Sequence, residues 1–303
     1  MAALTEAATP TLTYTEYACT ASGVPLSDIP TITSLCTHLS LSPSNEPMCD
    51  PLTLLRFTRA REGDVGKAGE MWTGTVEWRK ECGLKGRMGK YGKGCEYDGD
   101  GSRVGDECVW KWRYDKRQSD DATLVHSIGF FGRLSENTAG GEPVAVWRIG
   151  KCDLKSMKTH QEKIVEAFST HMEDLMQAGR AESFKQKKMV RTRLIIDLEG
   201  IGIGAIPYLS VIRAILGLGK QYFPEVTASA TLINAPWVFS KIWGLVKPML
   251  TTVMQAKVCI LGREWEEGLR EHSGLERRVL PKCIGGEGED EDVGQCQVAP
   301  ASA

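Results

Sequence analysis

Residues 194–234 read LIIDLEGIGIGAIPYLSVIRAILGLGKQYFPEVTASATLIN. The runs Leu194–Leu198 and Ser229–Asn234 are short and apolar, which is typical of buried β-strands. Between them, the apolar run from Ile206 to about Tyr222 has the length of a helix. A strand, a helix and a second strand in this order predict a parallel β-α-β unit.

The alternation of strand and helix continues on both sides of this stretch. Upstream, Val144–Ile149 alternates like a strand, and apolar residues over 164–176 recur at helical spacing. Downstream the pattern predicts three elements: an apolar helix over 237–255 interrupted at Pro248, a strand over 258–261 and a helix over 263–272. Residues 120–284 are therefore predicted to form one α/β domain with a largely parallel sheet.

The rest of the chain divides by composition. Residues 1–50 are rich in Thr, Ser, Ala and Pro, and we expect a mostly disordered acidic segment with one short helix near 32–41. Residues 51–83 are predicted to form a helical hairpin, with Asp50 and Asp64 as N-caps. Two segments lack apolar periodicity: a Gly-rich charged insertion or linker over 84–119, and a disordered acidic tail over 285–303.

Charge is distributed unevenly along the chain. Residues 1–50 contain five acidic residues and no Lys or Arg, and the residues from Ile284 onward repeat this. Residues 51–283 therefore hold all 37 basic residues and 29 of the 39 acidic residues. A positive body between acidic ends suits anionic surfaces such as lipid headgroups. Nucleic acid is disfavoured, because the basic residues are not interleaved with aromatic residues in a known motif.

The targeting and redox signals favour the cytoplasm. Ten scattered cysteines without a Cys-x-x-Cys pair favour reduced thiols. The first fifty residues lack the features of a secretory signal or a mitochondrial presequence. The best candidate for a membrane span, Trp237–Met254, contains Lys241, Lys247 and Pro248, so no span is predicted. We expect a cytoplasmic monomer with reversible peripheral membrane association.

The predicted helix over 237–255 is apolar around nearly its whole circumference. An ordinary surface helix keeps one polar face, so this helix requires apolar surroundings on two sides. It is either a buried core helix or a lid whose second face meets a lipid. The residues concerned include Trp237, Phe239, Ile242, Trp243, Val246 and Leu250.

Six short motifs occur in an order that resembles a known family. The hairpin reads LLRFTRAR over 54–61, followed by Asp64-Val65 and Glu77-Trp78-Arg79. Five landmarks follow: Pro143-Val144 with Arg148-Ile149-Gly150, Ile196–Gly200 (IDLEG), Tyr222–Glu225 (YFPE), Ile233–Pro236 (INAP) and Lys247-Pro248. Together these motifs, over roughly residues 50–285, closely resemble the CRAL-TRIO lipid-binding family, and within it the phosphatidylinositol transfer protein branch.

The resemblance implies a hydrophobic cleft with a mixed, largely parallel sheet as its floor and a gating helix as its lid. The apolar helix after Pro236 falls where that gate belongs, and Gly244 and Pro248 are candidate hinges. The expected pocket or gate residues are Trp237, Phe239, Ile242, Trp243, Val246 and Leu250.

The resemblance also implies a place for the lipid headgroup. Arg61 and Lys247 stand where phosphatidylinositol-binding members have basic residues, and a cationic pair suits a phosphodiester. Glu62 and Ala214 depart from that pattern, which leaves the identity of the lipid open. Arg213 is the third candidate residue for the headgroup site.

Arg213 is the only charged residue between Ile206 and Gly219. Burying an unpaired charge is costly, so we expect it to meet an acidic partner or a phosphate. The candidate acidic partners are Asp197 and Glu199.

Other patterns favour different chemistry less strongly. Gly200–Ala205 matches a loose dinucleotide-binding fingerprint, but it follows the second predicted strand and no acid ends the next one. An acidic stretch over 96–107 matches part of a calcium loop, although a solvated turn is favoured.

His171 is predicted to be a hydrogen-bonded core histidine, and the five histidines form no ligand pair. A basic run over 180–193 is either a solvated loop or a membrane contact.

These observations predict a cytosolic lipid-binding and lipid-transfer protein that encloses one phospholipid, with a phosphatidylinositol type favoured, and exchanges it at membranes. The first alternative is a lipid-sensing regulatory module that acts through a protein partner without transfer. The second is a nucleotide-dependent oxidoreductase that uses Gly200–Ala205. We expect no enzymatic activity, and we assign no catalytic residue, metal ligand or cofactor.

Overall fold

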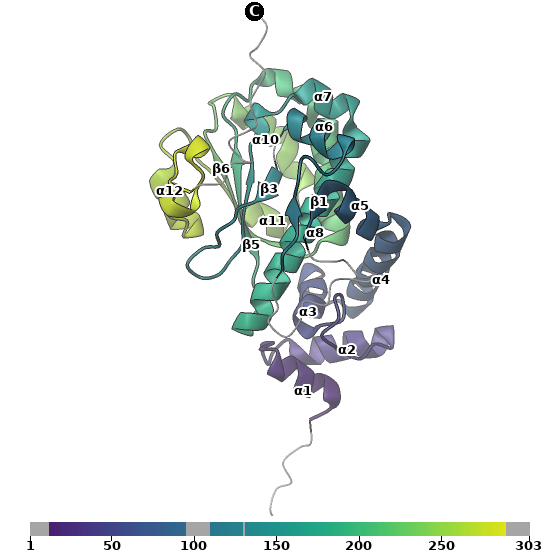
Figure 1. The fold of residues 1–303 in the computed structure, drawn as a ribbon. Helices are drawn as coiled ribbons and strands as arrows, with labels where there is room; N and C mark the ends of the chain where they lie inside the picture. Colours follow the sequence, from purple (N-terminus) through teal and green to yellow (C-terminus); the bar gives the residue numbers. More distant parts are fainter. Residues whose placement is uncertain (1–11, 95–109, 130, 289–303) are drawn as a thin grey trace, which may run out of the picture.

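A five-stranded sheet forms the centre of the computed structural model, which describes residues 12–94, 110–129 and 131–288. The strands lie side by side in the order β3-β4-β5-β6-β7 (Figure 1). β3 pairs antiparallel with β4, whereas the other neighbours are parallel, so the mixed, largely parallel sheet is confirmed. The strands are β3 (Phe131–Arg133), β4 (Val144–Trp147), β5 (Thr192–Asp197), β6 (Thr227–Ile233) and β7 (Val258–Ile260).

The order of the parallel strands determines where the helices lie. Each parallel strand is adjacent to the next one in sequence, and right-handed crossovers in one direction place their helices on one face of the sheet. The crossovers contain α7 (Leu154–Thr159), α8 (Gln161–Gln186), η2 (Ile203–Tyr208), α9 (Leu209–Tyr222), α10 (Phe239–Val246), η3 (Lys247–Met249) and α11 (Thr252–Ala256).

The opposite face of the sheet is covered by the C-terminal segment. Ile195 and Ile233 point to that side, where they pack against Trp265 and Leu269. Figure 1 shows α12 on this side, away from α10 and α11. The segment contains α12 (Glu266–Ser273), η4 (Arg277–Val279) and η5 (Lys282–Ile284), and it ends in a bridge between Pro281 and Gly288. The tail expected over 285–303 lies outside the described residues from 289 onward.

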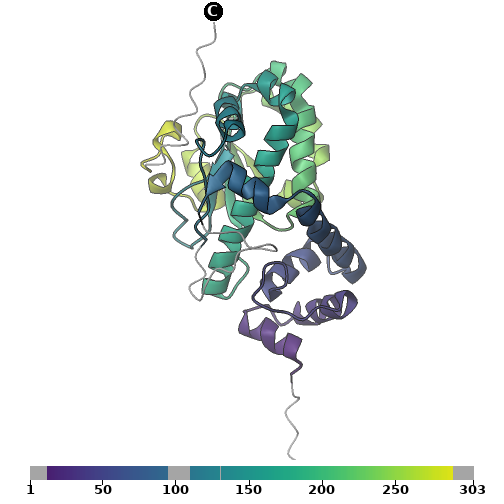
Figure 2. The ribbon, with the colours of Figure 1, turned by 45° about the vertical axis from the view of Figure 1, so that its right-hand side comes forward.

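Four helices precede the lobe and lie together at one end of it (Figures 1 and 2). The N-terminal helical hairpin is confirmed, and Asp50 and Asp64 accept hydrogen bonds from Thr53 N and Lys67 N as N-caps. The helices are α1 (Tyr14–Ala21), α2 (Ile29–Leu39), α3 (Pro51–Ala60) and α4 (Val65–Glu81).

The expectation that residues 1–50 are mostly disordered does not hold for residues 12–50. Cys19, Ile32, Leu35 and Cys36 are buried in the main apolar cluster, together with residues of α3 and α4. Ile32, Leu35 and Cys36 recur at helical spacing in α2, and their burial offsets the weak helix propensity of the surrounding Thr and Ser residues. Residues 1–11 lie outside the described part of the chain.

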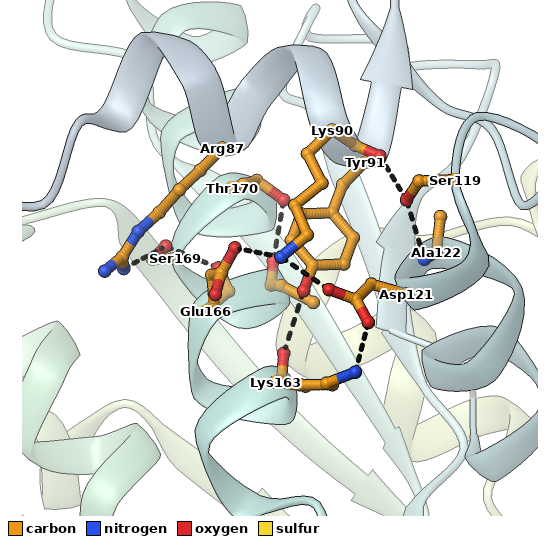
Figure 3. Close-up of polar contacts among 11 residues, drawn as sticks. Arg87, Lys90, Tyr91, Ser119, Asp121, Ala122, Lys163, Glu166, Ser169 and Thr170 are labelled. Carbon is orange, nitrogen blue, oxygen red and sulfur yellow. Dashed lines mark hydrogen bonds and ion pairs between the residues drawn. The ribbon is translucent and has the colours of Figure 1, made fainter.

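The segment expected as an insertion over 84–119 is ordered where the structure describes it. Lys90 of α5 pairs with Asp121 at 2.5 Å and with Glu166 of α8 at 2.9 Å, and Lys163 also pairs with Asp121 (Figure 3). These pairs connect α5 and α6 to α8. The elements here are α5 (Leu84–Tyr91), β1 (Gly92–Lys93), β2 (Arg113–Tyr114) and α6 (Asp120–Ile128). The calcium-loop pattern over 96–107 lies outside the described residues.

Buried ion pairs make α8 the link between the N-terminal helices and the lobe. Arg180 Nε contacts Asp50 Oδ2 at 2.8 Å, and both side chains are nearly inaccessible to solvent. Glu173 pairs with Arg79 of α4, and Asp174 pairs with Arg133 of β3 at 2.9 Å. Arg180 therefore belongs to the core, whereas the sequence analysis placed it in an exposed basic connection.

Candidate functional site

An apolar cavity of about 570 Å³ lies between the sheet and the crossover helices. Its floor includes Ile196, Ala230 and Leu232, which point to the face of the sheet opposite α12. One wall is α9, through Ile212 and Ile215 among others. Ligand cavities of roughly 300–1,000 Å³ accept a small organic molecule, so this volume is sufficient for one.

The other wall is the segment over 239–256, which we call the gating segment. It comprises α10, η3 and α11, and the chain becomes extended at Leu250 after Pro248 in η3. Five of the expected pocket or gate residues line the cavity: Phe239, Ile242, Trp243, Val246 and Leu250. A wall that is interrupted at a proline can move as two short pieces.

Trp237 does not line the cavity. Its side chain is 84% exposed, because Trp237 precedes α10 in a turn and points to solvent. Trp237 was expected to belong to the pocket or the gate; it is not part of the pocket in this structure, and a place in the gate stays a prediction. The gating segment has two apolar faces, and only the inner face contacts the cavity.

The lining of the cavity also includes charged residues. Arg59, Arg61 and Glu62 come from the end of α3, and Lys220 comes from the last turn of α9. Arg59 pairs with Asp28 at 3.0 Å. Arg61 donates to the Ala60 carbonyl at 3.0 Å, and neither Arg61 nor Lys220 has an acidic partner among the described residues. These two cations remain available to an anionic group.

Glu225 connects several parts of the molecule beside this polar region. Its carboxylate pairs with Arg191 at 2.6 Å and with Lys257 at 2.9 Å, and its carbonyl accepts from Arg56 Nη1 at 2.6 Å. Burial acts to raise the pKa of Glu225, but the hydrogen bonds and charges of Lys257 and Arg191 outweigh burial and lower the pKa. Lys257 directly follows α11, so Glu225 holds the end of the gating segment against the lobe.

The match to known proteins agrees with this geometry. The model of a family described as the CRAL/TRIO domain matches residues 131–286, which is more than half of the chain. This chain belongs to the CRAL/TRIO domain family. The resemblance seen in the sequence, including its phosphatidylinositol transfer protein branch, is confirmed.

Individual relatives match most of this chain. The chain is 29% identical over 242 residues to the Sec14 cytosolic factor of Schizosaccharomyces pombe, with 78% of this chain and 74% of that protein covered. It is 24% identical over 253 residues to the phosphatidylinositol/phosphatidylcholine transfer protein SFH12 of Arabidopsis thaliana, with 80% and 40% covered. The crystal structure of Sfh5 matches with a TM-score of 0.52 at 12% identity, over 88% of this chain and 89% of that chain, which shows the same fold.

Two of the three predicted headgroup residues lie outside the cavity of this CRAL/TRIO domain. Lys247 and Arg213 are exposed and do not line it. Arg213 was expected to meet an acidic residue or a phosphate, and it forms no ion pair with an acidic residue within the described ranges. Asp197 instead pairs with Arg148 at 3.4 Å, and Glu199 pairs with Lys151 at 2.8 Å. Arg213 needs no partner because α9 turns it toward water.

Sequence reasoning missed Lys220, Glu225 and Lys257 as residues of the site. Glu225 was visible only as part of the YFPE landmark, and the two lysines carry no motif that distinguishes them from ordinary surface lysines. They line the same cavity only because the crossovers bring distant parts of the chain to one face of the sheet.

The dinucleotide interpretation of Gly200–Ala205 lacks structural support. A CRAL/TRIO sheet with strands in sequential order has no reversal of strand order, which is where dinucleotide-binding folds form their crevice. Residues 203–208 form the 3₁₀ helix η2, and the α-helix α9 begins only at Leu209. No α-helix begins directly after the glycines to hold a pyrophosphate.

His171 belongs to the core beside the apolar cavity. Its ring stacks on Tyr114 at 4.9 Å and meets the edge of Phe131 at 5.2 Å. The expected hydrogen bond is not formed with any residue that the structure describes. Burial lowers the pKa of His171 to about 4, so the ring is neutral at pH 7. A second cavity at this position has a volume of about 40 Å³, which is too small for an organic ligand.

One segment of the domain has the length and composition of a membrane span, contrary to the expectation from sequence. It is Ile203–Tyr222, which comprises η2 and α9, and only 22% of its most apolar window is buried. Length and composition alone are weak evidence for a span. In this fold, the apolar side of the segment forms the wall of the cavity.

Proposed function

We propose that this protein binds one phospholipid in its cavity and transfers it between membranes. The observation that carries the proposal is the cavity of about 570 Å³, with an apolar lining, a gating segment as one wall, and Arg61 and Lys220 among its lining residues. Apolar walls accept acyl chains, and cations suit a phosphodiester.

The printed names of the relatives support the same function. One relative is named a Sec14 cytosolic factor, and another is named a phosphatidylinositol/phosphatidylcholine transfer protein. We therefore favour a phosphatidylinositol-type ligand, a cytosolic location and reversible peripheral contact with membranes. The proposal involves no covalent step, because the protein needs only to bind, shield and release its ligand.

We place the phosphate of the lipid between Arg61 and Lys220. Both cations line the cavity from different elements, α3 and α9, and each lacks an acidic partner among the described residues. An arginine offers several donors in a plane, and a lysine adds a compact charge. Lys247 and Arg213 receive no headgroup role in this closed conformation.

Extraction of the purified protein with organic solvent, followed by mass spectrometry, tests the proposal. We expect one phospholipid species at near-stoichiometric amount in the wild type. Ala230→Phe adds a ring from the floor of the cavity, so its lipid content should fall several-fold because acyl chains lose space. Arg61→Gln with Lys220→Gln should retain less phospholipid because the phosphate loses both cations.

Ala139→Phe is the matched control, because Ala139 is exposed on a loop that does not line the cavity. Its lipid content should equal that of the wild type. A wild type that contains no lipid would contradict the proposal. Lipid that stays bound in a vesicle-to-vesicle transfer assay would leave binding in place but favour the sensing module over transfer.

A further inference from the structure

The second cavity, which has a volume of about 40 Å³ and includes His171 in its lining, lies directly beside the main cavity. We call it the side chamber. Four apolar residues line both cavities and form the partition between them: Trp147 of β4, Met157 of α7, Phe168 of α8 and Ile215 of α9. Met157 is unbranched, so it changes its shape more readily than a branched or aromatic side chain.

Several walls of the side chamber come from the segment that precedes β3. Tyr114 belongs to β2, and Val125, His126 and Ile128 belong to α6. These elements lie before residue 131, where the match to the CRAL/TRIO domain begins. The side chamber therefore depends on a part of this chain that the family model does not cover.

His171 is a buried polar residue whose hydrogen bonding is not satisfied by the surrounding protein. It is only 5% exposed, and neither ring nitrogen has a hydrogen-bond partner within the residues that the structure describes. The ring is neutral at pH 7, so one nitrogen is a donor and the other is an acceptor. Because an unsatisfied buried polar group costs free energy, His171 is suited to bind a polar group that enters the side chamber.

The other polar side chains of the side chamber are engaged elsewhere. The Tyr114 hydroxyl donates to the Ala122 carbonyl, and the Cys152 thiol donates to the Arg148 carbonyl at 3.4 Å. The ring of His126 stacks on Tyr114 at 6.2 Å. His171 is therefore the residue of this lining on which we base the inference.

The volume and the apolar walls of the side chamber limit what His171 can bind. One water needs roughly 10–15 Å³ of such space, so about 40 Å³ admits a hydroxyl group with a short piece of chain, but no separate organic molecule. A charged group is disfavoured, because burial among apolar walls is costly for it. A hydroxyl group both donates and accepts, so it suits the neutral ring in either tautomer.

The side chamber lies along the main cavity and not at its headgroup end. Ile215 of the partition is five residues before Lys220 on α9, which is about 7.5 Å along the helix axis at ~1.5 Å per residue. The proposed function places the lipid phosphate at Lys220 and Arg61. Each leaflet of a bilayer holds chains of about 15 Å, half of the hydrocarbon thickness, so the partition faces the middle of an acyl chain.

We propose that the side chamber selects a lipid with a hydroxyl group near the middle of one acyl chain, and that His171 binds this hydroxyl. The hydroxyl enters when Met157 and Phe168 of the partition move aside. The inference rests on the proposed function, because the chain that carries the hydroxyl lies in the main cavity.

Lipid uptake from mixed vesicles tests the side chamber. The purified protein is incubated with phosphatidylcholine vesicles that contain equal amounts of three phosphatidylinositols, which differ only in carrying a stearoyl, a 2-hydroxystearoyl or a 12-hydroxystearoyl chain. Tandem mass spectrometry of the re-isolated protein then measures the ratio of the bound lipids. We expect the 12-hydroxystearoyl lipid to exceed the stearoyl lipid by roughly fivefold, since it gains one buried hydrogen bond. The 2-hydroxystearoyl lipid should show no enrichment, because its hydroxyl lies beside the headgroup.

His171→Phe keeps a ring in the core and removes both nitrogens, so the 12-hydroxystearoyl and stearoyl lipids should bind about equally. The ratio is measured within one sample, so it does not depend on how much of the variant is folded. His272→Phe is the matched control and should keep the wild-type ratio. His272 belongs to α12 on the opposite face of the sheet, is hydrogen-bonded to Thr231 at 2.8 Å, and lines neither cavity.

The outcomes separate this inference from the proposed function. Equal uptake of the stearoyl and 12-hydroxystearoyl lipids by the wild type would mean that the side chamber holds only water, and would overturn the inference while leaving lipid binding intact. Enrichment that persists in His171→Phe, or that extends to the 2-hydroxystearoyl lipid, would place hydroxyl binding elsewhere and overturn it as well. A wild type that takes up none of the three lipids would contradict the proposed function itself.

Discussion

Asp50 shows how one side chain can join two parts of this molecule. It caps α3 by accepting a hydrogen bond from Thr53 N at 2.9 Å, and it also pairs with Arg180 of α8 at 2.8 Å. Asp64 caps α4 in the same way, but its ion pair with Lys67 is on the surface. The two aspartates therefore separate the effect of a helix cap from that of a buried ion pair.

Asp50→Ala should lower the free energy of unfolding by about 3–5 kcal/mol, because it leaves the buried guanidinium of Arg180 without its acidic partner. Urea unfolding followed by circular dichroism measures the change. Asp64→Ala is the control and should cost much less, since only an exposed cap is lost. Equal losses in the two variants would show that Arg180 finds another partner.

At the scale of the element, the gating segment has one face toward the cavity and one toward solvent, and its C-terminal end is held by a charge pair. Lys257 contacts Glu225 at 2.9 Å and donates to the Thr227 carbonyl at 3.1 Å. Both side chains of the pair are largely buried. Opening of the gate at this end requires this pair to separate.

Lys257→Met should therefore loosen the end of the gating segment and speed the release of bound lipid. Hydrogen exchange measured by mass spectrometry should be faster over 250–257 than in the wild type, because fewer bonds resist local opening. Lys257→Arg keeps the charge and should stay close to the wild type. Unchanged exchange in Lys257→Met would mean that the pair with Glu225 does not hold α11, whose Gln255 also donates to the Lys247 and Leu250 carbonyls.

At the scale of the whole molecule, stability should depend on pH through His171. Burial lowers its pKa to about 4 in the folded protein, while Asp174 opposes this shift and His126 adds to it. The unfolded chain has the ordinary value near 6.5, so between pH 6.5 and pH 4 it binds a proton that the folded protein does not bind. Stability is therefore full above pH 6.5 and falls as the pH decreases toward 4.

His171→Phe should remove this contribution, which is on the order of 3 kcal/mol at pH 4. The difference in melting temperature between pH 7 and pH 4 should be smaller in the variant than in the wild type. Phenylalanine also keeps the ring contacts with Tyr114 and Phe131. The same pH dependence in both proteins would assign the effect to carboxylates such as Glu225.

Local sequence patterns alone determined much of the fold of this protein. The alternation over 144–272 predicted the sheet and its crossovers, and the landmarks IDLEG, YFPE and INAP predicted the family and the position of the gate. Such features are encoded in neighbouring residues, because strand and helix periods and turn motifs depend on short separations along the chain. The hairpin caps Asp50 and Asp64 were visible for the same reason.

Only the tertiary structure decided which side chains share the cavity. Arg61 and Lys220 are 159 positions apart in the chain, and both line one cavity because the helical hairpin packs against the lobe through α4 and α9. The sequence also did not reveal that Trp237 and Arg213 point to solvent. An apolar residue or an isolated charged residue looks the same in the sequence whether it lies on the inner or the outer side of a helix. Side-chain direction is decided by the partner that a helix packs against, and that partner is distant in the sequence.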